Sequence, residues 1–322
     1  MMSAQSLTGR TRFSFSEQEL ATFHEQGFAG PFDLYPEEET ARYLNALKPK
    51  LLNTRAAAYG NGKGVSGVTN LSNYDRHLDV PFLADHICRP EIVDRVTGIL
   101  GPDVLCWRTE FFPKYPGDEG TDWHQAANFA NVASSKKPQI EWPEGSGFQG
   151  TITVWTALTD CRVDNGCMQL MPGTHRVMNY DESKVMEYDE HRINNTAKGG
   201  VRRGFFGYDY RQLQKDPNWS PDESRARSMV MKAGQFIIFW STLLHASHPH
   251  TGQSKDMRLG FAARYLPTVV KVYPYSDGLD EFGGTASLEK HGCVLVAGRD
   301  DFNHNRFVHE TMNGHPFKTL AA

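Results

Sequence analysis

The chain has 322 residues, of which 39% are hydrophobic, so it is long enough to bury a large core. Charged residues make up 22% of the chain and the formal net charge is only −4, which argues against nucleic-acid binding and against disorder. No apolar run approaches the roughly 18–20 residues that span a bilayer, and the polar stretch from Met1 to Arg12 lacks the apolar segment of a signal peptide. We therefore expect neither a nucleic-acid partner nor a membrane partner.

The cysteines are few, odd in number and scattered, and none forms a C-x-x-C pair. They are Cys88, Cys106, Cys161, Cys167 and Cys293. This distribution indicates reduced thiols rather than a disulfide framework or a zinc site, and it predicts a cytoplasmic protein.

Three helices are expected in the first hundred residues. Ser16 and Glu19 fit a capping box that opens a helix over 16–26, and Gly27 suits its C-terminal end. A second helix is expected to begin near Pro36, which suits a first-turn position. A third is expected over 90–100, where apolar residues recur at helical spacing.

From about Val104 the sequence changes to short apolar, β-branched and aromatic stretches divided by Gly, Pro and Asp clusters. These predicted strands are Val104–Tyr115, Gly150–Leu158, Cys167–Met171, Ser228–Met231, Gln235–Trp240 and Leu259–Tyr265. Helices followed by many short strands predict a mostly β fold, with helices flanking a sandwich-like core. We expect a single domain over 1–322, with 1–12 flexible and 181–221 inserted over one mouth of the core.

Two histidine-bearing stretches lie more than a hundred residues apart, Thr121-Asp122-Trp123-His124-Gln125-Ala126 and His245-Ala246-Ser247-His248-Pro249-His250. Two histidines and one carboxylate form the metal-binding face of many non-haem Fe(II) oxygenases. The usual carboxylate lies two residues after the first histidine, and that position is Ala126, whose methyl group cannot bind a metal. The pattern indicates His124 and His245 as iron ligands with one ligand position open, for which we expect a halide.

Two alternatives remain open on the residues alone. Asp122 would share a face with His124 and Ala126 if the segment is extended, so Asp122 or water could supply the third ligand of a hydroxylase. The chain could also be a non-catalytic scaffold that has kept the fold and lost the metal site.

Arg258 lies thirteen residues after His245, on the next predicted strand. A guanidinium group binds a carboxylate through two parallel hydrogen bonds, so Arg258 could hold the distal end of a dicarboxylate.

Longer motifs strengthen this interpretation. They are Phe23-His24-Glu25-Gln26-Gly27-Phe28 and Asp164-Asn165-Gly166-Cys167-Met168-Gln169-Leu170-Met171-Pro172-Gly173-Thr174-His175-Arg176. Together with the histidine stretches they resemble the phytanoyl-CoA hydroxylase-like branch of Fe(II)/2-oxoglutarate oxygenases, across most of the chain. Within that branch, Trp-His-Gln-Ala and the segment around His245 resemble the aminoacyl-carrier-protein halogenases, the group of the syringomycin and cytotrienin biosynthetic enzymes.

The resemblance implies a double-stranded β-helix, a cupin-like jelly roll, that uses Fe(II), 2-oxoglutarate, O2 and chloride or bromide. His124 and His245 would bind iron, and the halide would fill the space beside Ala126. The other roles are implied in the same way: Thr121, Arg258 and Trp155 for 2-oxoglutarate, Asn131, Thr151 and Arg264 around the halide, and Glu110 and Phe112 on the substrate side.

The implied reaction is chlorination of an unactivated methyl carbon, with oxidative decarboxylation of 2-oxoglutarate to succinate. The implied substrate is an aliphatic aminoacyl group (2-aminobutyryl, valyl or threonyl) held as a thioester on the phosphopantetheine arm of a carrier protein, in nonribosomal peptide biosynthesis. Carrier proteins are usually acidic, so basic residue pairs are candidates for contacting one. These are Lys136–Lys137, Arg202–Arg203 and Arg225–Arg227.

Overall fold

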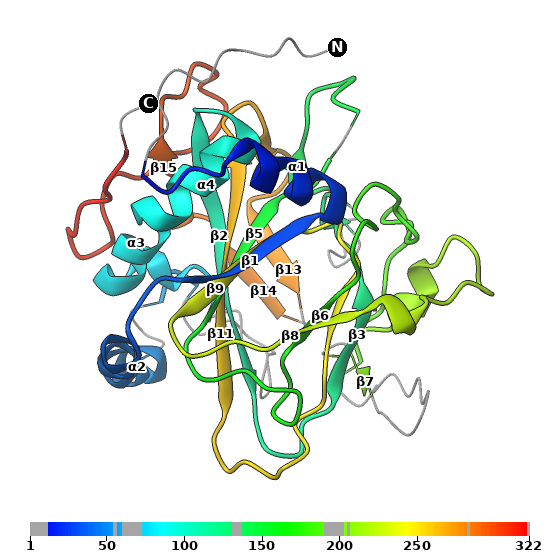
Figure 1. The fold of residues 1–322 in the computed structure, drawn as a ribbon. Coiled ribbons are helices and arrows are strands. Elements are labelled where there is room, and N and C mark those ends of the chain that lie inside the picture. The colour runs from blue at the N-terminus through cyan, green and yellow to red at the C-terminus, as the bar shows by residue number, and fades with distance from the viewer. Residues whose placement is uncertain are drawn as a thin grey trace.

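The computed structural model describes residues 12–53, 57–59, 73–130, 137–147, 149–189, 203–204, 207–281 and 284–320. Two β-sheets, antiparallel except for one parallel pair, form a jelly-roll core, and helices cover the larger sheet (Figure 1). The fold is therefore mostly β with flanking helices, as the sequence predicted.

The larger sheet has six strands in the order β1-β9-β5-β11-β2-β15. Their bounds are β1 (Phe28–Asp33), β9 (Gln235–Trp240), β5 (Ile152–Ala157), β11 (Arg258–Pro267), β2 (Val104–Lys114) and β15 (Val294–Ala297). The smaller sheet has the order β7-β3-β10-β6-β8. It consists of β7 (Arg203–Gly204), β3 (Gly120–His124), β10 (His245–Ser247), β6 (Met168–Leu170) and β8 (Arg227–Met229). Two further pairs join β12 (Lys271–Val272) to β4 (Ile140–Glu141) and β13 (Gly278–Glu281) to β14 (Gly284–Ser287).

Four α-helices precede most of the strands: α1 (Glu17–Gln26), α2 (Glu37–Leu52), α3 (Pro81–Ile87) and α4 (Pro90–Leu100). The capping box at α1 is present, because Ser16 accepts the Glu19 N–H at 3.2 Å and Glu19 accepts the Ser16 N–H at 2.7 Å. Gly27 ends α1 at φ +82°, in the left-handed region that favours glycine. Pro36 is the residue before the first turn of α2 rather than part of that turn, and α3 was not predicted. Short 3₁₀ turns complete the helices at η3 (Arg76–Leu78), η5 (Tyr210–Leu213) and η6 (Glu223–Arg225).

Alternation along the strands of the larger sheet separates two apolar layers. On β9, Phe236, Ile238 and Trp240 belong to the cluster beneath the helices, whereas Ile237 and Phe239 pack with residues of the smaller sheet. Since neighbouring residues of a strand face opposite sides, one face holds the helices and the other faces the interior of the jelly roll.

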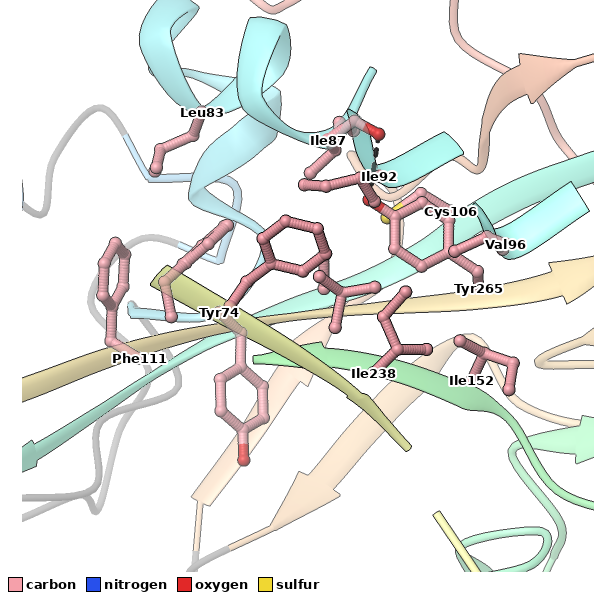
Figure 2. Packing of buried hydrophobic residues seen from close by; sticks show 14 of the residues in the cluster. Tyr74, Leu83, Ile87, Ile92, Val96, Cys106, Phe111, Ile152, Ile238 and Tyr265 are labelled. Atoms are coloured by element: carbon pink, nitrogen blue, oxygen red, sulfur yellow. Dashed lines mark hydrogen bonds between the residues drawn. The ribbon is translucent and has the colours of Figure 1, made fainter. Parts of the chain in front are cut away.

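The outer layer lies between the larger sheet and helices α3 and α4 (Figure 2). The labelled side chains of the helices are Leu83, Ile87, Ile92 and Val96, and those of the sheet include Cys106, Ile152, Ile238 and Tyr265. The Tyr265 hydroxyl donates a hydrogen bond to the Ile87 carbonyl at 2.9 Å, so the one polar atom of that ring is satisfied inside the layer.

All five cysteines are free and buried. Within the described part of the chain, no helix has both the length and the apolar character needed to cross a membrane.

Phe261 of β11 lies in the outer layer and is fully buried, with ring centroids 4.9 Å from Phe111 and 5.3 Å from His86. Phe261→Ala is expected to lower the free energy of unfolding by about 3–5 kcal/mol, because a large cavity would remain in a close-packed core. Urea denaturation measures this difference. The control Val230→Ala, at a side chain that is 55% exposed, is expected to change it by less than about 0.5 kcal/mol. Equal stability of the two variants would contradict this packing.

Candidate active site

Two imidazoles meet where β3 and β10 pair. His124 is the direct cross-strand partner of His245, and their ring centroids are 3.9 Å apart. His124 Nδ1 donates to the Asp122 carbonyl at 2.8 Å, and His245 Nδ1 donates to the Leu243 carbonyl at 2.7 Å. A carbonyl oxygen only accepts, so each ring keeps its proton on Nδ1 and its lone pair on Nε2, the arrangement of a metal-binding histidine.

Electrostatics favour the neutral form of both rings. Burial lowers the pKa of His124 well below its ordinary value. Burial likewise lowers the pKa of His245, to about 4. Both imidazoles are therefore neutral at pH 7, as metal ligation requires.

A bulge in β3 decides which of its side chains reach this pair. His245 and Ser247 are two residues apart on β10, whereas their partners His124 and Thr121 are three apart on β3. The extra residue breaks the alternation, so Thr121 and His124 both line the cavity described below and Asp122 does not. The expectation that Asp122 shares a face with His124 is therefore wrong. Its carboxylate instead accepts the Trp123 N–H at 2.8 Å.

Among the residues that the structure describes, no third protein ligand joins the pair. Within the described ranges, no group of three or more His, Cys, Asp or Glu side chains is placed to hold a metal ion. At the position where the usual carboxylate would lie, the Ala126 methyl group lines the cavity. Its backbone is fixed, because the Ala126 N–H donates to the Ser241 carbonyl at 2.9 Å and the Ser241 hydroxyl donates to the Ala126 carbonyl at 2.6 Å.

The cavity lies between the two sheets and has a volume of about 130 Å³. One water needs only about 10–15 Å³ measured in the same way, so the cavity can admit a larger ligand. Its wall brings together nine of the residues predicted from the sequence: Glu110, Phe112, Thr121, His124, Ala126, Trp155, His245, Arg258 and Arg264.

One end of the cavity carries a positive charge that no ion pair among the described residues neutralises. Arg258 is buried, its Nη1 donates to the Phe112 carbonyl at 2.9 Å, and its Nε has no hydrogen-bond partner. None of the ion pairs among the described residues includes Arg258. A buried guanidinium without a carboxylate is costly, so this end favours an anionic ligand.

Trp155 and Lys114 flank Arg258. The Trp155 ring lies 5.4 Å from the guanidinium, and Gly260 leaves room for it, since a Cβ there would fall 1.8 Å from the ring. Lys114 is the cross-strand partner of Arg258. Burial, together with the neighbouring charge of Arg258, lowers the pKa of Lys114 to about 7, although Asp118 and Glu119 act in the opposite direction.

The other end of the cavity is polar but balanced in charge. Arg264 donates to Glu110 at 2.8 Å, and its guanidinium lies 5.6 Å from the Phe129 ring. Glu281 lines the same cavity, and its carboxylate accepts hydrogen bonds from Arg108 and from the Tyr74 hydroxyl. The sequence assigned Arg264 to the halide and Glu110 to the substrate, and the structure joins the two side chains to each other.

The structure places one of two further predicted halide neighbours, Thr151, away from the cavity wall. Thr151 lies outside the lining, because its hydroxyl donates to the Tyr265 carbonyl at 2.8 Å and accepts the Trp107 Nε1–H at 3.2 Å. Its N–H donates to the Ser241 hydroxyl at 3.0 Å, so Ser241 is the polar side chain that reaches the wall. Asn131 lies outside the described residues.

Sequence reasoning missed several further lining residues, among them Lys114, Ser241 and Tyr210. Lys114 could have been found, because it continues the alternation of Glu110 and Phe112 on a predicted strand. Ser241 directly follows a predicted strand, and no local signal marked it. Tyr210, whose ring centroid lies 5.3 Å from His124, comes from the segment predicted to cover the core, of which 181–189, 203–204 and 207–221 are described.

Comparison with known proteins agrees with this geometry. The profile of the phytanoyl-CoA dioxygenase (PhyH) family matches residues 23–259, and the chain belongs to this family of Fe(II)/2-oxoglutarate oxygenases. The peroxisomal phytanoyl-CoA dioxygenases of Rattus norvegicus and Homo sapiens are 24% and 26% identical over 56% and 52% of this chain. The matched regions cover 44% and 40% of those proteins, less than half of their length.

Solved structures extend the likeness over nearly the whole chain. CytC3 with Fe(II) and alpha-ketoglutarate (2-oxoglutarate) is 45% identical, has a TM-score of 0.74, and the alignment covers 97% of this chain and 99% of that one. The nickel complex of ThoJ, a non-heme monooxygenase, is 21% identical with a TM-score of 0.57, covering 90% of this chain and 86% of that one. At that identity the likeness concerns the fold alone.

The Arg258 end predicts a pH-dependent affinity for a dicarboxylate such as glutarate. Lys114 is charged below about pH 7 and neutral above it, so the affinity is expected to fall roughly three- to tenfold between about pH 6 and about pH 8.5. Calorimetric titration measures this change. In Lys114→Met the dependence is expected to disappear, and an equally steep dependence in that variant would exclude Lys114 as its source.

Proposed function

We propose that this protein is a non-haem iron halogenase that chlorinates an unactivated methyl carbon of an aliphatic aminoacyl group held on a carrier protein. The observation that carries the proposal is Ala126. It places a methyl group on the cavity wall at the position where a carboxylate would complete a two-histidine iron site.

The residues present fit Fe(II) and 2-oxoglutarate. His124 and His245 would hold the metal through their Nε2 atoms, since hydrogen bonds from Nδ1 fix that tautomer in both rings. Arg258 would hold the distal carboxylate of 2-oxoglutarate, which would satisfy its orphaned Nε, with Thr121 and Trp155 beside it. The structure of CytC3 with Fe(II) and alpha-ketoglutarate, covering nearly the whole chain, supports these assignments. When bound, this pair supplies the activation of O2 and the oxidative decarboxylation of 2-oxoglutarate to succinate.

Charge explains why a halide is the proposed third ligand. Two neutral imidazoles leave the metal without the negative charge that a protein carboxylate supplies elsewhere in this class. Chloride or bromide beside Ala126 would restore that charge while remaining transferable. We propose Arg264 and Asn131 as neighbours of the halide, and Thr151 as a residue that acts on it only through Ser241.

The protein's part in the reaction is to place the substrate methyl group and to exclude water. Phe112, Phe129 and Phe239 line the cavity, so much of its wall is apolar. Transfer of chlorine rather than hydroxyl requires the reacting carbon to lie nearer the halide, and a displacement of about 1 Å is enough to change the outcome. We propose that Glu110 and Phe112 set this position from the substrate side.

We propose an aminoacyl-S-phosphopantetheinyl carrier protein as the partner that delivers 2-aminobutyryl, valyl or threonyl groups, and nonribosomal peptide biosynthesis as the pathway. Of the basic candidates, Lys137, Arg225 and Arg227 are exposed and available to an acidic carrier. Lys136 and Arg202, and the side chain of Arg203, lie outside what the structure describes.

The product distinguishes a halogenase from a hydroxylase of the same family. Carrier proteins loaded with 2-aminobutyryl, valyl or threonyl groups are incubated with the protein, Fe(II), 2-oxoglutarate, chloride and O2, and analysed by intact mass spectrometry. We expect replacement of hydrogen by chlorine, shown by the chlorine isotope pattern, together with succinate. Hydroxylated product alone would favour the hydroxylase with water as third ligand, and absence of both product and succinate would favour the scaffold.

Ala126→Asp tests the open ligand position itself. A carboxylate there would occupy the halide position, so chlorination is expected to fall by about a hundredfold or more, a loss of about 2.7 kcal/mol in transition-state stabilisation. Hydroxylation need not appear, because the substrate position is set for chlorine transfer. Ala126→Ser, which adds no charge, is the matched control and is expected to retain more chlorination than the Asp variant. Chlorination by Ala126→Asp at the parent rate would contradict the proposal.

A further inference from the structure

The carboxylate of Glu182 lies outside the cavity and accepts hydrogen bonds from the backbone that directly follows Ala126. Glu182 is 8% exposed, and its oxygens accept hydrogen bonds from three consecutive backbone N–H groups. The distances are 3.0 and 3.1 Å from Ala127, 2.8 Å from Asn128 and 3.2 Å from Phe129. None of the ion pairs among the described residues includes Glu182. In the described part of the chain, this carboxylate is therefore held by backbone dipoles.

The turn that Glu182 binds has an unusual backbone. Phe129 has φ +61°, in the left-handed region that residues with side chains rarely adopt. Consecutive N–H groups that converge on one point need an acceptor, since a poorly solvated donor without one destabilises the conformation. The Glu182 carboxylate supplies that acceptor and stabilises this form of the turn.

Neighbours of Glu182 hold the same stretch from the other side of Ala126. The Tyr180 hydroxyl donates to the Trp123 carbonyl at 2.7 Å, and the Asn179 N–H donates to the Gln125 side chain at 3.0 Å. The segment 179–182 thus follows the chain from 123 to 129, with contacts before and after Ala126. Glu182 is the member of this segment that contacts the turn itself.

We propose that Glu182 is a positioning residue, which fixes the turn after Ala126 and thereby the cavity wall beside the open ligand position. Phe129 carries the effect, because its N–H bonds to Glu182 and its side chain lines the cavity. With this wall fixed, the space beside Ala126 keeps its shape, and relaxation of the turn admits water. The link to the halide rests on the proposed function, whereas the fixing of the turn does not.

Glu182→Gln tests the proposal. The amide keeps the size of the side chain but replaces one acceptor oxygen by an NH2 group facing N–H donors. The amides of Ala127, Asn128 and Phe129 are expected to exchange with deuterium roughly tenfold faster. The chloride concentration for half-maximal chlorination is expected to rise roughly fivefold, with more hydroxylated product. The affinity for 2-oxoglutarate is expected to stay within about twofold, because the Arg258 end is untouched.

Asp181→Asn is the matched control. Asp181 precedes Glu182 in the chain, but its carboxylate accepts the Ser183 N–H at 3.0 Å and does not contact the turn. This variant is expected to behave as wild type in exchange, chloride dependence and product ratio. Thermal unfolding of both variants verifies that each is folded.

The two readouts separate the inference from the proposed function. Unchanged exchange of the three amides in Glu182→Gln overturns the inference, and so does faster exchange with an unchanged product ratio and chloride dependence. If wild type forms no chlorinated product, the proposed function fails and the exchange measurement alone decides whether Glu182 fixes the turn. A loss of 2-oxoglutarate affinity equal to the loss of chlorination would indicate a merely structural role and would also overturn the inference.

Discussion

The antiparallel pairing of β3 with β10 is the constraint on which the candidate site depends. It brings together two histidines from distant parts of the chain, with ring centroids 3.9 Å apart. Each ring is then oriented by the same device, an Nδ1–H bond to the carbonyl two residues earlier. The bulge in β3 adds a second consequence, since it directs Thr121 into the cavity and keeps Asp122 out of it.

The larger sheet supplies the rest of the site through strict alternation. On β11, Leu259, Phe261 and Tyr265 pack under the helices, while Arg258 and Arg264 face the cavity. The two arginines differ in what they contact: Arg264 is paired with Glu110, whereas Arg258 has an orphaned Nε and no ion pair in the described structure. This asymmetry gives the cavity an end suited to a carboxylate and an end whose charges are already balanced.

The residue pattern predicted those helices and strands that are marked by a signal within their own sequence, such as a capping box or an apolar run. The capping box predicted the start of α1, and the predicted strand Gln235–Trp240 has the same bounds as β9. Strand β1 was missed because Gly30 and Pro31 interrupt its sequence, and α3 was missed because seven residues give little periodicity. Nine of the lining residues were predicted, because the histidine motifs and the family resemblance implied them. The wrong predictions depend on long-range contacts that the sequence does not reveal. The β3 bulge turns Asp122 away from the cavity, and the hydrogen bonds of the Thr151 hydroxyl to Trp107 and Tyr265 hold that hydroxyl away from the cavity wall.

We propose that the open ligand position beside Ala126 accepts a halide. Anomalous diffraction from crystals grown without oxygen in Fe(II), 2-oxoglutarate and bromide tests it most directly. We expect a bromide peak bonded to an iron held by His124 and His245, lying against the Ala126 methyl group. A metal whose third position holds only water, or a side chain of the protein such as Asp122, would contradict it.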